Sequence, residues 1–137
     1  IRMTDAMKDL LQSLKEKVTL GIITNGPAQH QWDKVNALGL KEWIPVGHIF
    51  ISGALGVAKP DKRIFSRAAD RLGILPEEIC YVGDSFENDI AGAKAAGWNA
   101  IWYNHRGHKA TGDVKPDEIV TSEEELIACL EKISMKE

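Results

Sequence analysis

The sequence has 137 residues, the length of one domain, and its 44% apolar and 27% charged residues are typical of a globular protein with a core. A net charge of −3 excludes a basic surface for nucleic acid and a polybasic membrane patch, and no apolar run approaches the roughly 18 residues of a membrane helix. The length predicts a single domain over residues 1–137. Two separated cysteines and no signal-peptide layout predict a reducing, cytoplasmic setting.

Helix and strand patterns alternate along the chain. Apolar residues at helical spacing predict helices over residues 4–17, 28–38, 62–72, 90–96 and 123–133. Apolar and β-branched runs predict strands over residues 18–24, 48–52, 79–82 and 99–103, with a short edge strand at 118–120. This order predicts an α/β fold, Rossmann-like, in which a parallel sheet carries helices on both faces.

Residues 79–97 are the most informative stretch of the chain. A short apolar strand ends at Gly83, Asp84 follows at once, and Asp89 comes five positions later, before a small-residue helix. Open α/β sheets place their chemistry at the carboxyl ends of strands, and two carboxylates there suit Mg²⁺. Read in isolation, the two would be a turn residue and a helix N-cap, because aspartate is favoured at both positions.

Two upstream elements reach the same edge of the predicted sheet. Thr24 offers a hydroxyl at the end of its strand, and the N–H groups of Asn25 and Gly26 can face an anion at a helix start. Lys59 follows the strand at 48–52 and can neutralise a phosphoryl oxygen. Hydroxyl, cation and metal-binding carboxylates together predict a clamp for a transferring phosphoryl group. Taken singly, Thr24 would be a strand-end turn residue and Lys59 a solvated lysine.

The chain resembles the haloacid dehalogenase superfamily of hydrolases. The matching motifs are I-I-T-N-G at residues 22–26, K-P at 59–60 and G-D-S-F-E-N-D at 83–89. The resemblance implies Mg²⁺-dependent hydrolysis of a small phosphorylated metabolite. It assigns Asp84 and Asp89 to the metal, the residues Thr24, Asn25, Gly26 and Lys59 to the phosphate, and Lys59 and Asp84 to catalysis. Residues 100–104 further resemble members that dephosphorylate nucleotides or sugar phosphates.

The sequence departs from the family in one decisive respect. It contains no Asp-x-Asp-x-Thr or Ser motif, whose first aspartate is the family's nucleophile, and no helical cap before Thr24. In the family the strand before that motif lies between the strands that end here at Thr24 and Val82. We therefore expect an incomplete sheet, and an amino-terminal segment or another chain that completes it. Without that segment we expect almost no activity.

Three alternatives remain open from the sequence. A generic flavodoxin-like or receiver-like module would explain the fold but not why all three elements occur. A non-catalytic module that binds phosphate or a partner would explain the absent nucleophile. A 2-haloacid dehalogenase would use the same fold but needs no metal, which the acidic pair Asp84 and Asp89 argues against.

Overall fold

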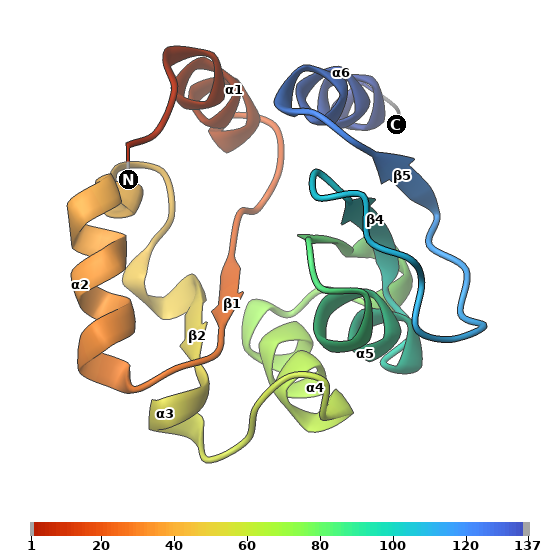
Figure 1. Cartoon of the computed structure of the whole chain (residues 1–137). Coiled ribbons are helices and arrows are strands. Elements are labelled where there is room, and N and C mark those ends of the chain that lie inside the picture. The colour runs from red at the N-terminus through yellow and green to blue at the C-terminus, as the bar shows by residue number, and fades with distance from the viewer. Residues whose placement is uncertain (1, 136–137) are drawn as a thin grey trace.

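The computed structural model describes residues 2–135, and its elements alternate as the sequence predicts (Figure 1). The helices are α1 (Asp5–Lys15), α2 (Ala28–Leu38), α3 (Ser52–Leu55), α4 (Lys62–Leu72), α5 (Gly92–Ala95) and α6 (Glu123–Ser134). The strands are β1 (Ile22–Thr24), β2 (Ile49–Ile51), β3 (Cys80–Gly83), β4 (Asn99–Tyr103) and β5 (Glu118–Val120). The short helices are η1 (Leu40–Glu42), η2 (Val46–His48), η3 (Pro76–Glu78) and the π-helix η4 (Phe86–Ala91).

The strands of the described chain form two sheets. One pairs β1 with β2 and the other orders β3, β4 and β5, and all of these pairings are parallel. Within residues 2–135 no strand pairing joins β1 to β3, and Figure 1 shows the two sheets standing apart. The parallel α/β class is therefore confirmed, and the interruption lies where the sequence predicts a missing central strand.

Helices cover both faces of the strands and cross from one sheet to the other. On one face, Ile23 of β1 and Trp102 of β4 belong to a single core cluster with Ile64 and Phe65 of α4, which are fully buried. On the opposite face, α1 contributes Leu11 to the cluster beside β1 and β2, and Met7 to the cluster beside β3, β4 and β5. Packing of α1 and α4 therefore connects two sheets that share no ladder.

The boundaries of two predicted elements are wrong. The strand predicted at 18–24 is confined to residues 22–24, because β2 pairs only with these residues, and Val18 is exposed. The helix predicted at 90–96 begins earlier, as the π-helix η4, in which the Ile90 N–H donates to the Ser85 carbonyl five residues before it. That start draws Asp89 into the helix, whereas the sequence places it in the preceding turn.

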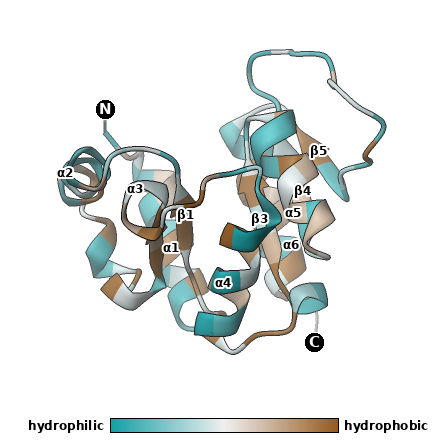
Figure 2. Cartoon of the chain, turned by 90° about the horizontal axis from the view of Figure 1, so that it is seen from below, coloured by the Kyte–Doolittle hydropathy of each residue, from teal (hydrophilic) through white to brown (hydrophobic). Residues whose placement is uncertain are grey.

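The segment between β4 and β5 is a loop, as predicted. Figure 2 shows this connection projecting from the rest of the chain and coloured mainly as hydrophilic. Both cysteines are free thiols. No helix in the described part of the chain is long and apolar enough to cross a membrane.

Candidate active site

The carboxyl end of β1 presents the hydroxyl of Thr24. This hydroxyl accepts a hydrogen bond from the Gln31 side chain of α2, which is 7% exposed. A hydroxyl has one donor and two acceptor positions, so Thr24 keeps its proton for another acceptor. The predicted anion donor Gly26 is differently engaged, because its N–H donates to Ser52 Oγ at 2.9 Å. An anion would reach that N–H only after Ser52 moves.

The side chain of Asn25 joins two of the sequence motifs. Its Nδ2 donates to the Lys59 carbonyl at 3.0 Å, and its Oδ1 accepts from the Lys59 N–H at 2.9 Å. The two bonds attach the Lys59 backbone, 34 residues away in sequence, to the end of β1. In this structure the Asn25 side chain therefore positions Lys59.

The side chain of Lys59 lies between the two sheets, in the gap between β1 and β3 that we call the seam. Its ammonium contacts Asp89 Oδ1 at 2.7 Å and donates to the Tyr81 hydroxyl at 3.1 Å, and the Lys59 and Asp89 side chains are 13% and 6% exposed. The Tyr81 hydroxyl in turn donates to the Ile23 carbonyl of β1 at 3.0 Å. Burial, then the negative charges of Asp89 and Asp84, raise the pKa of Tyr81, so the phenol stays protonated and can donate.

Asp84 stands at the carboxyl end of β3, and its side chain is 44% exposed. Its carbonyl accepts from the Trp102 indole at 3.0 Å, which fixes the turn to β4. Its carboxylate is 3.5 Å from His105 Nε2 and 3.6 Å from Arg106 Nη2. These are long, solvent-accessible contacts, so the Asp84 carboxylate can take a closer ligand without breaking a buried hydrogen bond.

Asp89 has no such freedom. One oxygen is paired with Lys59 and the other accepts from the Ser85 N–H at 3.0 Å. Gly83 makes this packing possible, because a Cβ there would lie 2.3 Å from the Asp89 Cβ, closer than real side chains approach. The buried Asp89 carboxylate therefore stabilises the turn that carries Asp84, by binding the Ser85 N–H and the Lys59 ammonium.

The donor set fits Mg²⁺ through one direct carboxylate. In residues 2–135 no three acidic, histidine or cysteine side chains gather as a metal cluster. Mg²⁺ is commonly held by one or two carboxylates together with waters and substrate phosphate oxygens. Asp84 is suited to be that direct ligand, with Asp89 behind it.

The sequence predicts that Thr24, Lys59, Asp84 and Asp89 share one edge, and the structure brings Lys59 and Asp89 into direct contact. Sequence reasoning missed Gln31 and Tyr81. Gln31 lies on the inward face of α2 with the buried Val35, four residues further on. A polar residue at the spacing of the apolar ones was the sequence signal that could have identified it. Tyr81 carries the polar tip in the otherwise apolar run at 79–82. The contacts of Asp84 with His105 and Arg106 had no signal, because they depend on how the loop after β4 folds back.

Comparison with known proteins identifies the family of the chain. Residues 2–97 match the family model of the haloacid dehalogenase-like hydrolases. The chain belongs to this family. This haloacid dehalogenase-like chain is 36% identical over 131 residues to the glyceraldehyde 3-phosphate phosphatase of Pyrococcus furiosus, and the match covers 93% of this chain and 53% of the relative.

Solved structures of the family show the same fold. A 2-haloacid dehalogenase from Pseudomonas syringae pv. Tomato has a TM-score of 0.80 at 33% identity, over 96% of this chain and 54% of that one. The HAD-hydrolase YfnB from Bacillus subtilis, bound to magnesium, has a TM-score of 0.84 at 26% identity, over 97% of this chain and 56% of that one. The haloacid dehalogenase-like chain thus spans about half the length of these relatives.

Proposed function

We propose that this chain forms the phosphate- and Mg²⁺-binding part of a phosphohydrolase that acts on a small phosphate monoester. The observation that carries the proposal is the nearly buried Lys59 ammonium, held by Asp89 and Tyr81 in the seam between the sheets. The phosphatase activity of the relative from Pyrococcus furiosus and the magnesium bound to YfnB support the same assignment.

Each residue has a role that follows from its contacts. The Thr24 hydroxyl donates a hydrogen bond to a phosphoryl oxygen, while the Gln31 side chain holds the hydroxyl in place. Lys59 offsets the negative charge that the phosphoryl oxygens carry, and Asp89 keeps its ammonium in position. Asp84 would hold Mg²⁺, which supplies further charge neutralisation at the phosphoryl group. The Asn25 and Gly26 N–H groups remain proposed anion donors, and the Gly26 N–H requires Ser52 to move.

This sequence contains no Asp-x-Asp-x-Thr or Ser motif, and we propose that the nucleophile comes from a segment outside it. We propose that a segment bearing this motif adds a strand between β1 and β3. Its first aspartate then attacks phosphorus, the alcohol leaves with a proton from the second aspartate, and water hydrolyses the aspartyl phosphate. The carbonyl of Ile23, now bonded to the Tyr81 hydroxyl, is a ladder group that such a strand would approach.

The test is hydrolysis of p-nitrophenyl phosphate by the chain alone and after mixing with a synthetic peptide. The peptide carries an apolar strand followed by D-x-D-x-T, and the control peptide carries N-x-N-x-T. We expect turnover only with the first peptide and Mg²⁺, none with EDTA, and an increase in the melting temperature with both peptides. Robust turnover by the chain alone, or neither turnover nor stabilisation on mixing, would contradict the proposal.

Calorimetric titration with Mg²⁺ tests the metal site separately. Asp84→Asn should abolish binding, whereas Asp113→Asn, an exposed aspartate in the loop after β4, should leave it unchanged. Equal Mg²⁺ affinity in the Asp84→Asn variant and the wild type would remove Asp84 from the metal site.

A second candidate function is supported by the likeness to the 2-haloacid dehalogenase of Pseudomonas syringae. A dehalogenase needs no metal, so halide release from 2-chloropropionate that continues in EDTA would favour it. Phosphate and Mg²⁺ binding with no turnover in the presence of the D-x-D-x-T peptide would instead favour the non-catalytic module.

A further inference from the structure

The loop after β4 is organised by its own hydrogen bonds. The side chain of Asn104 accepts from the His108 N–H at 2.9 Å and donates to the His108 carbonyl at 2.9 Å. Gly107 supplies the left-handed turn between them, with a φ of 66°. The His105 ring lies 4.7 Å from the Tyr103 ring, centroid to centroid. These contacts present residues 105–109 to Asp84 in a defined conformation.

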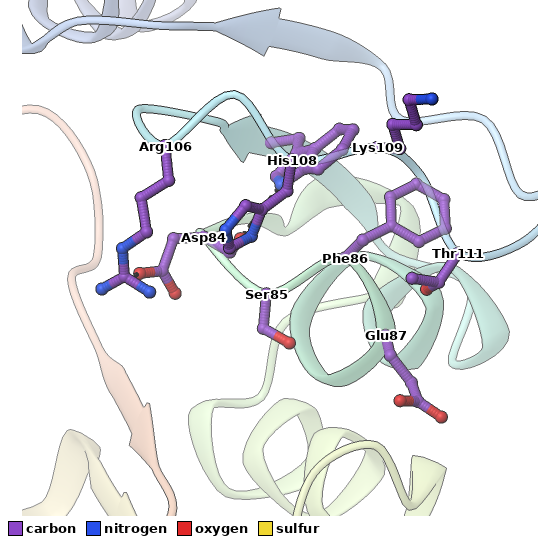
Figure 3. A pocket seen from close by; sticks show the side chains of 9 residues that line it. Asp84, Ser85, Phe86, Glu87, Arg106, His108, Lys109 and Thr111 are labelled. Atoms are coloured by element: carbon purple, nitrogen blue, oxygen red, sulfur yellow. Dashed lines mark hydrogen bonds and ion pairs between the residues drawn. The ribbon is translucent and has the colours of Figure 1, made fainter.

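A pocket of about 460 Å³ lies between this loop and the turn that carries Asp84. Its apolar wall is formed by Phe86 and Trp102, whose ring centroids are 5.0 Å apart. Arg106 and His108 line it from the loop, and Figure 3 shows Arg106 extended toward the Asp84 carboxylate.

With a divalent cation on Asp84, the charges around this pocket would favour an anion. Arg106, His108 and Lys109 line it on the loop side, although Figure 3 shows the Lys109 ammonium directed outward. Its acidic side chains are Asp84, which we assign to Mg²⁺, and Glu87. The Arg106 guanidinium now pairs loosely with Asp84 at 3.6 Å. Once a divalent cation neutralises Asp84, the guanidinium has no anionic partner at that position.

We propose that Arg106, with His108 beside it, binds a carboxylate of the substrate. The substrate is then a phosphate monoester that carries a carboxylate a few atoms from the phosphoryl group, and Phe86 and Trp102 contact the carbon atoms near it. A guanidinium binds a carboxylate through two parallel hydrogen bonds, which a lysine cannot reproduce. The singly charged carboxylate suits the pocket better than a second phosphate, because Glu87 would repel the more highly charged group. This inference rests on the proposed phosphohydrolase function.

The experiment compares two ligands that differ by the carboxylate. The dissociation constants of 2-phosphoglycolate and ethyl phosphate are measured by titration calorimetry on the whole chain with Mg²⁺ present. We expect 2-phosphoglycolate to bind about tenfold tighter, and Arg106→Gln to reduce that ratio to about twofold or less while the ethyl phosphate constant stays unchanged. Arg106→Lys should retain part of the preference, because it keeps the charge but loses the paired geometry.

Arg63→Gln is the matched control, because Arg63 is also an exposed arginine paired with an aspartate, Asp61, but it does not line the pocket. Equal binding of both ligands by the wild type, or a preference that survives Arg106→Gln, would overturn the carboxylate site while leaving the proposed phosphohydrolase function intact. If neither ligand binds, the phosphate site and the carboxylate site both fail.

Discussion

The Tyr81 hydroxyl of β3 donates a hydrogen bond to β1 across the seam between the sheets, and Tyr81→Phe tests that role directly. The substitution keeps the ring, which packs edge-on against Phe65 with centroids 5.3 Å apart. It removes the hydrogen bond to the Ile23 carbonyl and the one from Lys59. Any loss of stability therefore reports on the hydroxyl and not on the packing of the ring.

The expected loss is about 2 kcal/mol. A neutral hydrogen bond contributes about 0.5–1.5 kcal/mol and one to a charged group about 1.5–3 kcal/mol, which sum to about 2–4.5 kcal/mol. The lower part of that sum applies, because Lys59 keeps its 2.7 Å contact with Asp89. With a urea m-value of about 1.5 kcal/mol/M, the unfolding midpoint should fall by about 1.3 M.

The measurement is urea unfolding followed by circular dichroism and tryptophan fluorescence. Tyr103→Phe is the matched control, because the Tyr103 hydroxyl has no hydrogen bond to any residue in the range 2–135 and its loss should leave the midpoint almost unchanged. A midpoint shift for Tyr81→Phe no larger than that of Tyr103→Phe would refute the bridging role of the hydroxyl.

The remaining predictions concern charged groups. Lys59→Met should destabilise the fold by about 3 kcal/mol in urea unfolding, because it leaves the Asp89 carboxylate without its ion-pair partner, and a shift no larger than that of the exposed Lys62→Met would contradict this. Burial opposes ionisation of Asp117, but hydrogen bonds from Lys94 and a backbone N–H outweigh it and lower its pKa. The Asp117 carboxylate therefore contributes to the free energy of unfolding above about pH 4, and this contribution is lost as the pH falls through the lower folded pKa. Asp117→Asn should lower the free energy of unfolding by under about 1 kcal/mol, and by less in acid. A loss of stability that does not depend on pH would exclude this contribution.

Much of the fold could be predicted because its signals are local. Helices α2 and α4 have the predicted bounds, since each has regular apolar spacing and ends at a glycine with positive φ, Gly39 or Gly73. The start of the helix after β3 was not local. It depends on Asp89, whose carboxylate contacts the Lys59 ammonium, 30 residues away in sequence, and accepts from the N–H of the N-cap residue Ser85.

The element order predicts which strand ends lie at one edge of the sheet, but it does not predict the hydrogen bonds between the candidate residues. Parallel strands bring Thr24 and Asp84 to one edge, and this needs only the element order. Which side chains pair there depends on how the two sheets face each other across the seam, and the spacing of apolar residues does not predict those pairs. Asn25 shows the difference, because its N–H is a predicted anion donor, whereas nothing in the sequence indicates that its side chain binds the backbone of Lys59.

The helices that cross from sheet to sheet affect the thermodynamics of adding a strand. Because α1 and α4 pack against both sheets, the separation of β1 and β3 is set before any further segment arrives. Thr4 strengthens this arrangement, since its hydroxyl donates to Glu123 at the start of α6 at 2.7 Å. An incoming strand would then lose its own conformational entropy but would not have to order its neighbours, which is the advantage of a preorganised receptor.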